Sequence, residues 1–589
     1  MKFQCVNDLA AHWNEAVDVS VDICPPNMTG DLTLNCFRLA KPLKSNPMAV
    51  AQDAAEFLGN HANVTDVEVV KAFVNFTLTE EALFRDTIGD QQAMLDLALI
   101  DASARKRIRI EYSAPNTNKP LHLGHLRNNS LGMALVEISK RVGHEVIAIN
   151  LVNDRGVHIC KSMLAYQLFG EGQTPESTGT KGDHLVGDFY IKYAQELKRE
   201  VAALKEAQPD LVDKTEEELF LQTDLGKATQ KMLQDWEDKD PDVRALWQKM
   251  NGWVLDGFKQ TYDRMGVKFD KTYFESDTYT LGKDIIEKGL EKGVFYKRED
   301  GATEIDLSAK KLDKKVVLRS DGTSVYITQD IGTTLLKAQD FEPDGMVWVV
   351  GNEQIYHFNV LFAICKELGY EWSDDLFHLA YGMVNLPHGR MKSREGTVVD
   401  ADQLFDEMHE LAKAAVLERV GDQVPDDLEH RAEVIGLGAV KFMLLKVGPK
   451  TTMKFDPEAA IKFEGDTCAR IQNSYARISS IKRKAADREM AETVVWSLLN
   501  HPKERVLALA CADYGNVMKR AAVAHDPSGL CNYLIDLATA FNSFYNDCPV
   551  VKDDVAPALR RSRLELIERV QVVLGDGLKT LTIESLESM

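Results

Sequence analysis

The sequence predicts an α/β protein in which a Rossmann-type parallel sheet lies between a small α+β N-terminal domain and an all-α C-terminal domain. Residues 107–112 alternate apolar and polar side chains as a strand does, and a helical pattern and the apolar run VIAIN (146–150) follow. A second strand–helix unit begins at MVWVVG (346–351), and the pattern is helical almost to the end after about residue 405. Two βαβ halves followed by helices account for these observations.

The first βαβ unit has clear boundaries. Apolar side chains alternate from Ile108 to Tyr112, the turn PNTNKP (115–120) follows, and apolar residues then recur at helical spacing up to Val142. A further strand is predicted at SVYIT (324–328), ahead of MVWVVG. The two halves of the sheet are therefore expected to be separated by about 170 residues of chain.

The remaining segments give the domain division. VEVVKAFVNFTLT (67–79) alternates as an edge or hairpin strand pair does, and the strongly charged stretch from about 195 to 250 predicts exposed helices inserted between the halves of the sheet. The expected domains are an N-terminal domain at 1–106, the parallel-sheet domain at 107–405 with a helical insertion at about 160–270, a connecting helical stem at 406–455, and a helical domain at 456–589.

Composition excludes several classes of protein. A net charge of −21 argues against a uniformly basic nucleic-acid binder, although local clusters at 105–109, 477–484 and 560–563 are either nucleic-acid contacts or solvated helix faces. Nine scattered cysteines without a C-x-x-C pair predict reduced thiols and no zinc site. Short apolar runs and an N-terminus without a signal sequence predict no membrane segment and a cytoplasmic protein.

The strongest chemical signal is the stretch PNTNKPLHLGHLRN (115–128), at the predicted join between strand and helix. No Walker A or G-x-G-x-x-G loop occurs in the chain, so a phosphate has to be bound in another way. A helix N-terminus carries unpaired N–H groups and partial positive charge, His122 and His125 can donate hydrogen bonds to a phosphate, and Gly124 lets a nucleotide approach closely. The pattern H-x-G-H predicts a nucleotide site at this turn.

These residues resemble the class I aminoacyl-tRNA synthetases, and the arginyl-tRNA synthetases in particular. His122-Leu123-Gly124-His125 is similar to the HIGH signature, and the frame from Ser113 to Arg127 is similar to its arginyl form. The second signature, KMSKS, resembles Arg390-Met391-Lys392-Ser393-Arg394. The resemblance covers nearly the whole chain, and it identifies the helical C-terminal domain as an anticodon-binding domain.

One departure from the signature affects catalysis. Ser393 stands where KMSKS has its second lysine, and the family is thought to compensate with a lysine just ahead of HIGH, which is Lys119 here. Lys392, which is adjacent to Ser393, is the alternative candidate to replace the absent lysine. The resemblance therefore implies catalytic roles for His122, His125, Lys119, Lys392 and Ser393, and ATP binding by His122, Gly124, His125, Met391 and Lys392.

Recognition of free arginine requires carboxylates directed at a guanidinium, together with polar groups for the amino-acid end. The resemblance implies that Glu275 and Asp330 bind the guanidinium and that Asn116 and Gln354 hold the polar end, with Tyr326 beside them. Read without the resemblance, Asp330 is equally a helix cap and Glu275 equally a surface charge.

The implied function is that of an arginine–tRNA ligase. Such an enzyme activates arginine with ATP, which enters as its Mg²⁺ complex, and then transfers the arginine to tRNA. We expect a monomer that needs tRNA for the activation step. Tentative tRNA contacts are Phe73, Asn75, Arg477, Arg560 and Arg563. Two alternatives stay open at this point: a small-metabolite nucleotidyltransferase with an H-x-G-H turn, and an inactive tRNA-binding relative.

Overall fold

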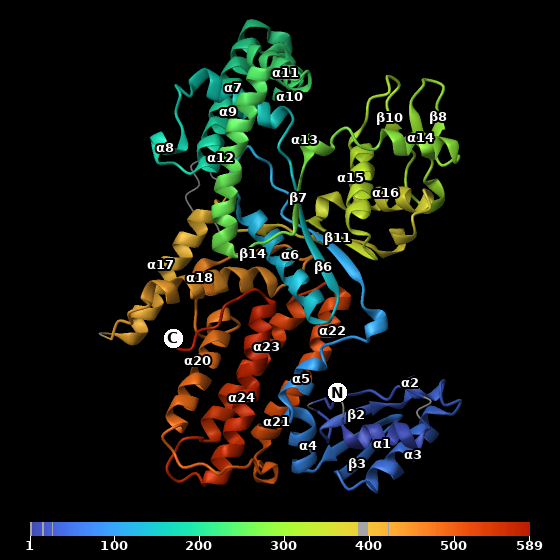
Figure 1. Ribbon diagram of the computed structural model, residues 1–589, viewed down its shortest axis with the longest axis vertical. Coiled ribbons are helices and arrows are strands. Elements are labelled where there is room, and N and C mark those ends of the chain that lie inside the picture. The colour runs from blue at the N-terminus through green and yellow to red at the C-terminus, as the bar shows by residue number, and fades with distance from the viewer. Residues whose placement is uncertain (1–2, 15–16, 26, 387–398, 422) are drawn as a thin grey trace.

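A computed structural model describes residues 3–14, 17–25, 27–386, 399–421 and 423–589. Figure 1 shows the parallel sheet near the centre, a helical insertion above it, and the N-terminal domain and a helical bundle beside each other at the base. Among the described residues, no helix combines the length and apolar character that a membrane crossing requires. All nine cysteines are buried and free, as the sequence predicts.

The N-terminal domain is a four-stranded antiparallel sheet of order β1-β2-β4-β3. Its elements are α1 (Gln4–His12), β1 (Val21–Ile23), β2 (Leu32–Asn35), α2 (Cys36–Ala40), α3 (Pro47–Gly59), β3 (Val64–Val70) and β4 (Phe73–Leu78). β3 and β4 form the predicted hairpin, in which Lys71 adopts φ of 58° at the turn. Two short helices, α4 (Glu80–Ile88) and α5 (Gln91–Asp96), lead from this domain to the central sheet.

The central sheet has five parallel strands in the order β12-β11-β5-β6-β7. Its strands are β5 (Arg107–Glu111), β6 (Glu145–Val152), β7 (Lys271–Phe274), β11 (Gly345–Gly351) and β12 (Leu376–Tyr381). The chain builds outward from β5 in both directions, so the strand order reverses between β5 and β11. The crevice at the carboxyl ends of these two strands is where ligands bind in folds of this type.

Helix α6 (Leu123–Arg141) follows β5 and is buried along nearly its whole length. Gly132 permits this close packing, because a Cβ there would lie 2.2 Å from the ring of Tyr112, the residue after β5. Helix α18 (Leu428–Leu445) contacts α6. The helix that carries the H-x-G-H residues is therefore held in the protein core.

One strand prediction is wrong. SVYIT (324–328) does not form a strand: Val325 is the N-cap residue of helix α15 (Tyr326–Phe341). The run of β-branched residues favours a strand locally, but Ile327, Ile331 and Ala338 are all buried on one helical face, and this packing overrides the local propensity. Helix α15 therefore begins at the site with Tyr326 and Asp330 in its first two turns.

Two insertions interrupt the sheet. The first lies between β6 and β7 and consists of α7 (Val157–Phe169), α8 (Pro175–Thr178), α9 (Gly182–Ala207), α10 (Glu216–Leu219), α11 (Asp224–Glu237) and α12 (Pro241–Met265). The second contains α13 (Glu275–Thr278), α14 (Lys283–Glu291), and a small sheet of β8 (Tyr296–Lys297), β9 (Thr303–Ile305) and β10 (Lys315–Leu318). Helix α16 (Ile355–Glu367) follows β11 and packs with α15 around a second core that contains Trp348.

The C-terminal part is helical. Its elements are α17 (Ala401–Val420), α18, α19 (Pro457–Ala460), α20 (Cys468–Ala485), α21 (Pro502–Ala512), α22 (Tyr514–Ala524), α23 (Ser528–Asp547) and α24 (Pro557–Thr580). Strands β13 (Val384–Asn385) and β14 (Met453–Lys454) pair with each other. The ion pair between Arg141 of α6 and Asp576 of α24, 2.7 Å long, ties the bundle to the central domain.

Candidate functional site

The turn between β5 and α6 is held in an unusual backbone conformation. Ser113 and Ala114 both have positive φ, at 77° and 46°, a region that costs residues with side chains about 1 to 3 kcal/mol. Side-chain amides stabilise the turn: Ser113 N–H donates to Oδ1 of Asn128 at 2.5 Å, and Ala114 N–H donates to Oδ1 of Asn150 at 3.0 Å. Asn116 then pairs with Asn153, the first residue after β6, at the carboxyl edge of the sheet.

The two histidines of H-x-G-H form the N-cap of α6. Nδ1 of His122 accepts the N–H of Gly124 at 3.1 Å, and Nδ1 of His125 accepts the N–H of His122 at 3.2 Å. Their rings lie 3.9 Å apart between centroids. A Cβ on Gly124 would lie 3.0 Å from Cε1 of His122, so any larger residue there would press on the imidazole.

Both imidazoles are neutral at physiological pH. Burial, and then the charge of Lys119, lower the pKa of His122 to about 4, and burial lowers the pKa of His125 well below its usual value. Because each Nδ1 accepts a backbone N–H, the ring proton of each must be on Nε2. The turn therefore presents two neutral N–H donors.

Lys119 lies beside these rings. Burial lowers the pKa of its ammonium, and its positive charge acts on both His122 and His125. Within the described part of the chain, Lys119 has no ion pair or hydrogen bond from its Nζ. The position leaves a cation available for an anionic ligand at the helix N-terminus. Met391, Lys392 and Ser393 lie outside the described residues.

Glu275 and Asp330 are close together although 55 residues separate them in sequence. Glu275 follows β7, and Asp330 lies in the second turn of α15. Burial, followed by the negative charge of Asp330, raises the pKa of Glu275 to about 7. Nε2 of His357 lies 2.6 Å from Oδ2 of Asp330, whereas Glu275 has no ion pair with a cation among the described residues. A raised carboxyl pKa beside a second carboxylate is the electrostatic setting in which a cation can be bound.

The other predicted arginine-site residues lie around the same edge of the sheet. Gln354 follows β11 in the chain and is exposed, and Tyr326 is 83% exposed at the start of α15. Asn116 lies on the β5 side and is half-buried. Each side chain is free of hydrogen bonds to other described residues, so each can contact a ligand without first breaking a contact.

Asp154, which the sequence analysis did not single out, holds the residue next to Glu275 in place. Its carboxylate accepts the N–H and hydroxyl of Ser276 at 2.9 and 2.7 Å, and burial raises its pKa. Arg127 was also missed. Its side chain is fully buried and donates to the carbonyl oxygens of Pro449 and Thr451, each at 2.9 Å, so it does not line the turn. No motif spacing marks either role.

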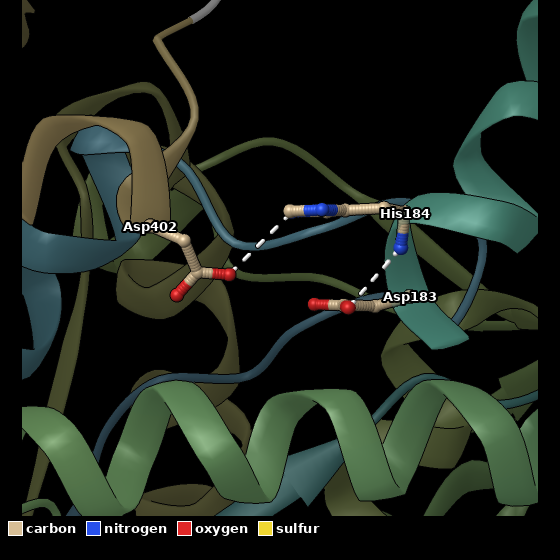
Figure 2. A group of neighbouring side chains, drawn as sticks. All are labelled: Asp183, His184 and Asp402. Carbon is tan, nitrogen blue, oxygen red and sulfur yellow. Dashed lines mark hydrogen bonds and ion pairs between the residues drawn. The ribbon is translucent and has the colours of Figure 1, made fainter. Parts of the chain in front are cut away.

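A third polar group lies next to the H-x-G-H turn. Figure 2 shows Asp183 and His184, from the start of α9, facing Asp402 at the start of α17. The three could together ligate a metal ion by distance alone. Nζ of Lys181 already lies 2.6 Å from Asp402 and 3.2 Å from Asp183, so a protein cation compensates these carboxylates.

Comparison with known proteins accounts for all three regions of the chain. Residues 91–456 match the description "tRNA synthetases class I (R), catalytic domain", residues 471–589 match "DALR anticodon binding domain", and residues 4–78 match "Arginyl tRNA synthetase N terminal domain". The chain belongs to the arginyl-tRNA synthetase family. It is an arginine–tRNA ligase, an ATP-dependent class I enzyme whose substrates are arginine, ATP and tRNA.

The relatives match over almost their full length. The arginine–tRNA ligase of Parabacteroides distasonis is 45% identical over 95% of this chain and 94% of its own, and that of Bacteroides thetaiotaomicron is 43% identical over 98% and 97%. The solved arginyl-tRNA synthetase of Thermus thermophilus covers 99% of the chain, with a TM-score of 0.80 at 26% identity. The family, the fold class and the activity that the sequence resemblance implies are therefore confirmed, and the two alternative functions are not favoured.

The residues predicted to contact tRNA have different surroundings. Phe73 is half-buried, and its ring meets the exposed Phe37 edge-on, with 5.9 Å between centroids. Asn75 is 1% exposed, with its amide directed at Sδ of Met28. Arg560 is 4% exposed and donates only to backbone carbonyls, and Arg563 pairs with the buried Glu504 at 2.6 Å. The two C-terminal arginines thus stabilise the bundle.

Arg477 lies in a pocket of about 520 Å³ in the helical bundle. Among the described residues, three arginines of this pocket, Arg419, Arg470 and Arg477, have no ion pair with a carboxylate. Nη1 of Arg477 lies 2.7 Å from Oδ1 of Asn542, and its guanidinium lies 5.0 Å from the centroid of the Tyr545 ring. The other lining residues are Phe463, Glu464, Gly465, Asn473 and Asn546.

Proposed function

We propose that Glu275 and Asp330 bind the guanidinium of arginine in the activation step of this ligase. The observation that carries this proposal is the raised pKa of Glu275, which burial and the charge of Asp330 bring to about 7. A planar guanidinium can donate to two carboxylates at once, and its charge removes their mutual repulsion. An amino acid without a cation would leave the pair uncompensated at a cost of about 3 to 5 kcal/mol, so binding alone rejects it.

The amino-acid end is held at the carboxyl edge of the sheet. Asn116 and Gln354 follow the strands β5 and β11, which flank the reversal of strand order, and the half-buried Asn116 pairs with Asn153. We assign them to the α-amine and carboxylate, and Tyr326 to the wall of the same subsite. This arrangement directs the arginine carboxylate toward the turn that contains His122 and His125.

The nucleotide binds at the N-terminus of α6. The Nε2–H groups of His122 and His125 donate to the α-phosphate without adding positive charge, and Lys119 supplies the cation. ATP enters as its Mg²⁺ complex. The arginine carboxylate attacks the α-phosphorus, and pyrophosphate leaves. Positioning of the two reactants accounts for roughly 7 to 11 kcal/mol of the barrier, and hydrogen bonds to the developing charge lower it further.

In the second signature, we propose catalytic roles for Lys392 and Ser393 and ATP binding by Met391 and Lys392. Lys119 is the better candidate for the absent second lysine, because its Nζ acts electrostatically on both signature histidines and is free of other described partners. In the second step, a terminal ribose hydroxyl of tRNA attacks the carbonyl carbon of the adenylate, and AMP leaves.

Two surfaces are proposed for tRNA. The aromatic pair Phe37 and Phe73 on the N-terminal domain suits stacking by an unpaired base, and the buried Asn75 lies two residues after Phe73 on β4. The pocket with Arg419, Arg470 and Arg477 suits the phosphates of the anticodon loop, because its cations are not paired within the described part of the protein. We propose a monomeric enzyme, because a single chain carries both surfaces, and we propose that it acts in the cytoplasm.

The experiment that tests the proposed function is ATP–pyrophosphate exchange measured with arginine, with and without tRNA. We expect exchange with arginine only when tRNA is present, no exchange with lysine or glutamine, and loss of exchange in Glu275→Gln. Exchange at undiminished rates in Glu275→Gln would contradict the assignment of the guanidinium subsite.

A further inference from the structure

The charged group around His184 connects the helical insertion to the segment that follows the second signature. His184 and Asp183 lie in the first turn of α9, and Asp400 and Asp402 lie at the start of α17. Nε2 of His184 is 3.0 Å from Oδ2 of Asp400 and 3.4 Å from Oδ2 of Asp402. Figure 2 shows the imidazole reaching across from α9 to Asp402.

Asp400 is also in direct backbone contact with the H-x-G-H turn. His122 and Asp400 form an antiparallel bridge, in which Leu123 N–H donates to the carbonyl of Val399 at 2.9 Å and Ala401 N–H donates to the carbonyl of Leu121 at 3.0 Å. The residues that place the His122 ring are thus hydrogen-bonded to a segment whose other side faces His184. A shift of that segment would displace His122.

The side chain of Asp400 has two separate contacts. Oδ1 accepts the N–H groups of Asp402 and Gln403, each at 3.0 Å, and caps α17. Oδ2 faces His184. The side chain of Asp400 thereby joins the start of α17 to α9. The backbone of Asp400 pairs with that of His122 at the start of α6.

The base of α9 is fixed against α12. Asp183 is fully buried, and a Cβ on Gly257 of α12 would lie 2.4 Å from its Oδ1. Lys181 donates to Thr261 of α12 at 2.5 Å as well as to Asp183 and Asp402. Burial lowers the pKa of His184, but the ion pair with Asp400 and the charges of Asp183 and Asp402 outweigh burial and raise it. The imidazolium is therefore held on a rigid support.

We propose that His184 is a positioning residue for the activation reaction: its ion pair with Asp400 fixes the Val399–Ala401 segment against the H-x-G-H turn and thereby orients His122. In this proposal His184 contacts none of the three substrates. Its effect on the reaction is transmitted through Asp400 and the backbone pairing. The inference rests on the proposed role of His122 at the α-phosphate.

The test is a double-mutant cycle in ATP–pyrophosphate exchange with tRNA present, using His184→Gln and Asp400→Asn. Asparagine keeps the oxygen that caps α17, so Asp400→Asn removes the ion pair and spares the helix. We expect each single variant to lower kcat by roughly ten-fold with KM for arginine within about two-fold, and the double variant to be no slower than the slower single variant. An additional ten-fold loss in the double variant, or unchanged kcat in both single variants, would overturn the proposal.

His409→Gln is the matched control. His409 lies on α17, the helix that Asp400 caps, and is half-buried as His184 is. It pairs with Glu429 and Glu433 at 2.9 and 2.8 Å, and none of its described contacts is with the H-x-G-H turn. We expect it to lower the melting temperature about as much as His184→Gln and to leave kcat unchanged. An equal kcat loss in both variants would reduce the role of His184 to general stability. The variant His122→Asn separates the proposed role of His122 at the α-phosphate from the positioning role of His184. Normal exchange in His122→Asn would reject the role of His122 itself.

Discussion

Binding of L-arginine is expected to release a proton from Glu275 at neutral pH. In the free protein, burial and the charge of Asp330 raise the pKa of Glu275 to about 7. The carboxyl group is therefore about half protonated at pH 7. A bound guanidinium favours the ionised form and returns the pKa to about its ordinary value or below, so the proton must leave as arginine binds.

The size of the effect follows from this shift. About 0.9 proton should be released per arginine at pH 6, about 0.5 at pH 7 and about 0.1 at pH 8. Because the proton competes with arginine, the dissociation constant should rise roughly ten-fold between pH 8 and pH 6, which corresponds to about 1.4 kcal/mol. The sign is fixed: an acid with a raised pKa weakens cation binding as pH falls through that pKa.

Isothermal titration calorimetry in buffers of different ionisation enthalpy measures the number of protons directly. Glu275→Gln should abolish this release and weaken arginine binding at least about 100-fold. Asp277→Asn, an exposed acid of the same short helix, is the control with normal binding. Proton release below about 0.1 at pH 6 in the unmodified protein would refute the reasoning.

Three further variants test other parts of the account. Lys119→Ala should lower the rate of adenylate formation far more than it weakens arginine binding; equal small effects on both would dismiss Lys119 as the substitute lysine. Arg560→Met should lower the melting temperature strongly, because four carbonyl contacts are lost, while KM for tRNA stays within about two-fold; a large rise in KM would return Arg560 to the tRNA surface. His409 donates to Glu429 and Glu433 at once, which requires its charged form, and its pKa is raised overall although burial opposes the rise. Its contribution to stability is full below about pH 6.5 and is lost as pH rises through the raised value, so the stability difference between the unmodified protein and His409→Gln should shrink at high pH in thermal unfolding.

The fold was predictable wherever a local pattern and the final packing agree. The strand from Arg107 to Glu111 alternates apolar and polar residues, and β11 is apolar throughout, so both could be predicted as strands from spacing. The alternation did not predict that Arg109 and Glu111 are buried as well. The start of α15 could not. Tyr326, Ile327 and Thr328 favour a strand but begin a helix there, because Ile327 and Ile331 pack into the second core together with residues distant in sequence.

The residues of the functional site also differ in whether the sequence could predict them. His122, Gly124 and His125 act through neighbouring backbone groups, so their short-range motif carries their geometry. Glu275 and Asp330 meet only when β7 and α15 are folded, and the resemblance rather than any pattern indicated the pair. His184 has no motif at all, because its partners lie more than 200 residues away.

The buried arginines illustrate a limit of charge patterns. Arg560 and Arg563 belong to a basic cluster that suggests nucleic-acid binding, yet both are committed to contacts inside the bundle. Arg419 and Arg470 lie far from that cluster and line the pocket instead. Basic residues in sequence indicate a surface only when folding leaves their charge unpaired.

The most direct test of the central claim is a crystal structure of the enzyme with a non-hydrolysable arginyl-adenylate analogue. The guanidinium is predicted to donate to both Glu275 and Asp330 at about 3 Å, with the group replacing the α-phosphate at hydrogen-bond distance from Nε2 of His122 or His125. A guanidinium that contacts neither carboxylate, in an analogue otherwise bound at the carboxyl edge of the sheet, would contradict the account.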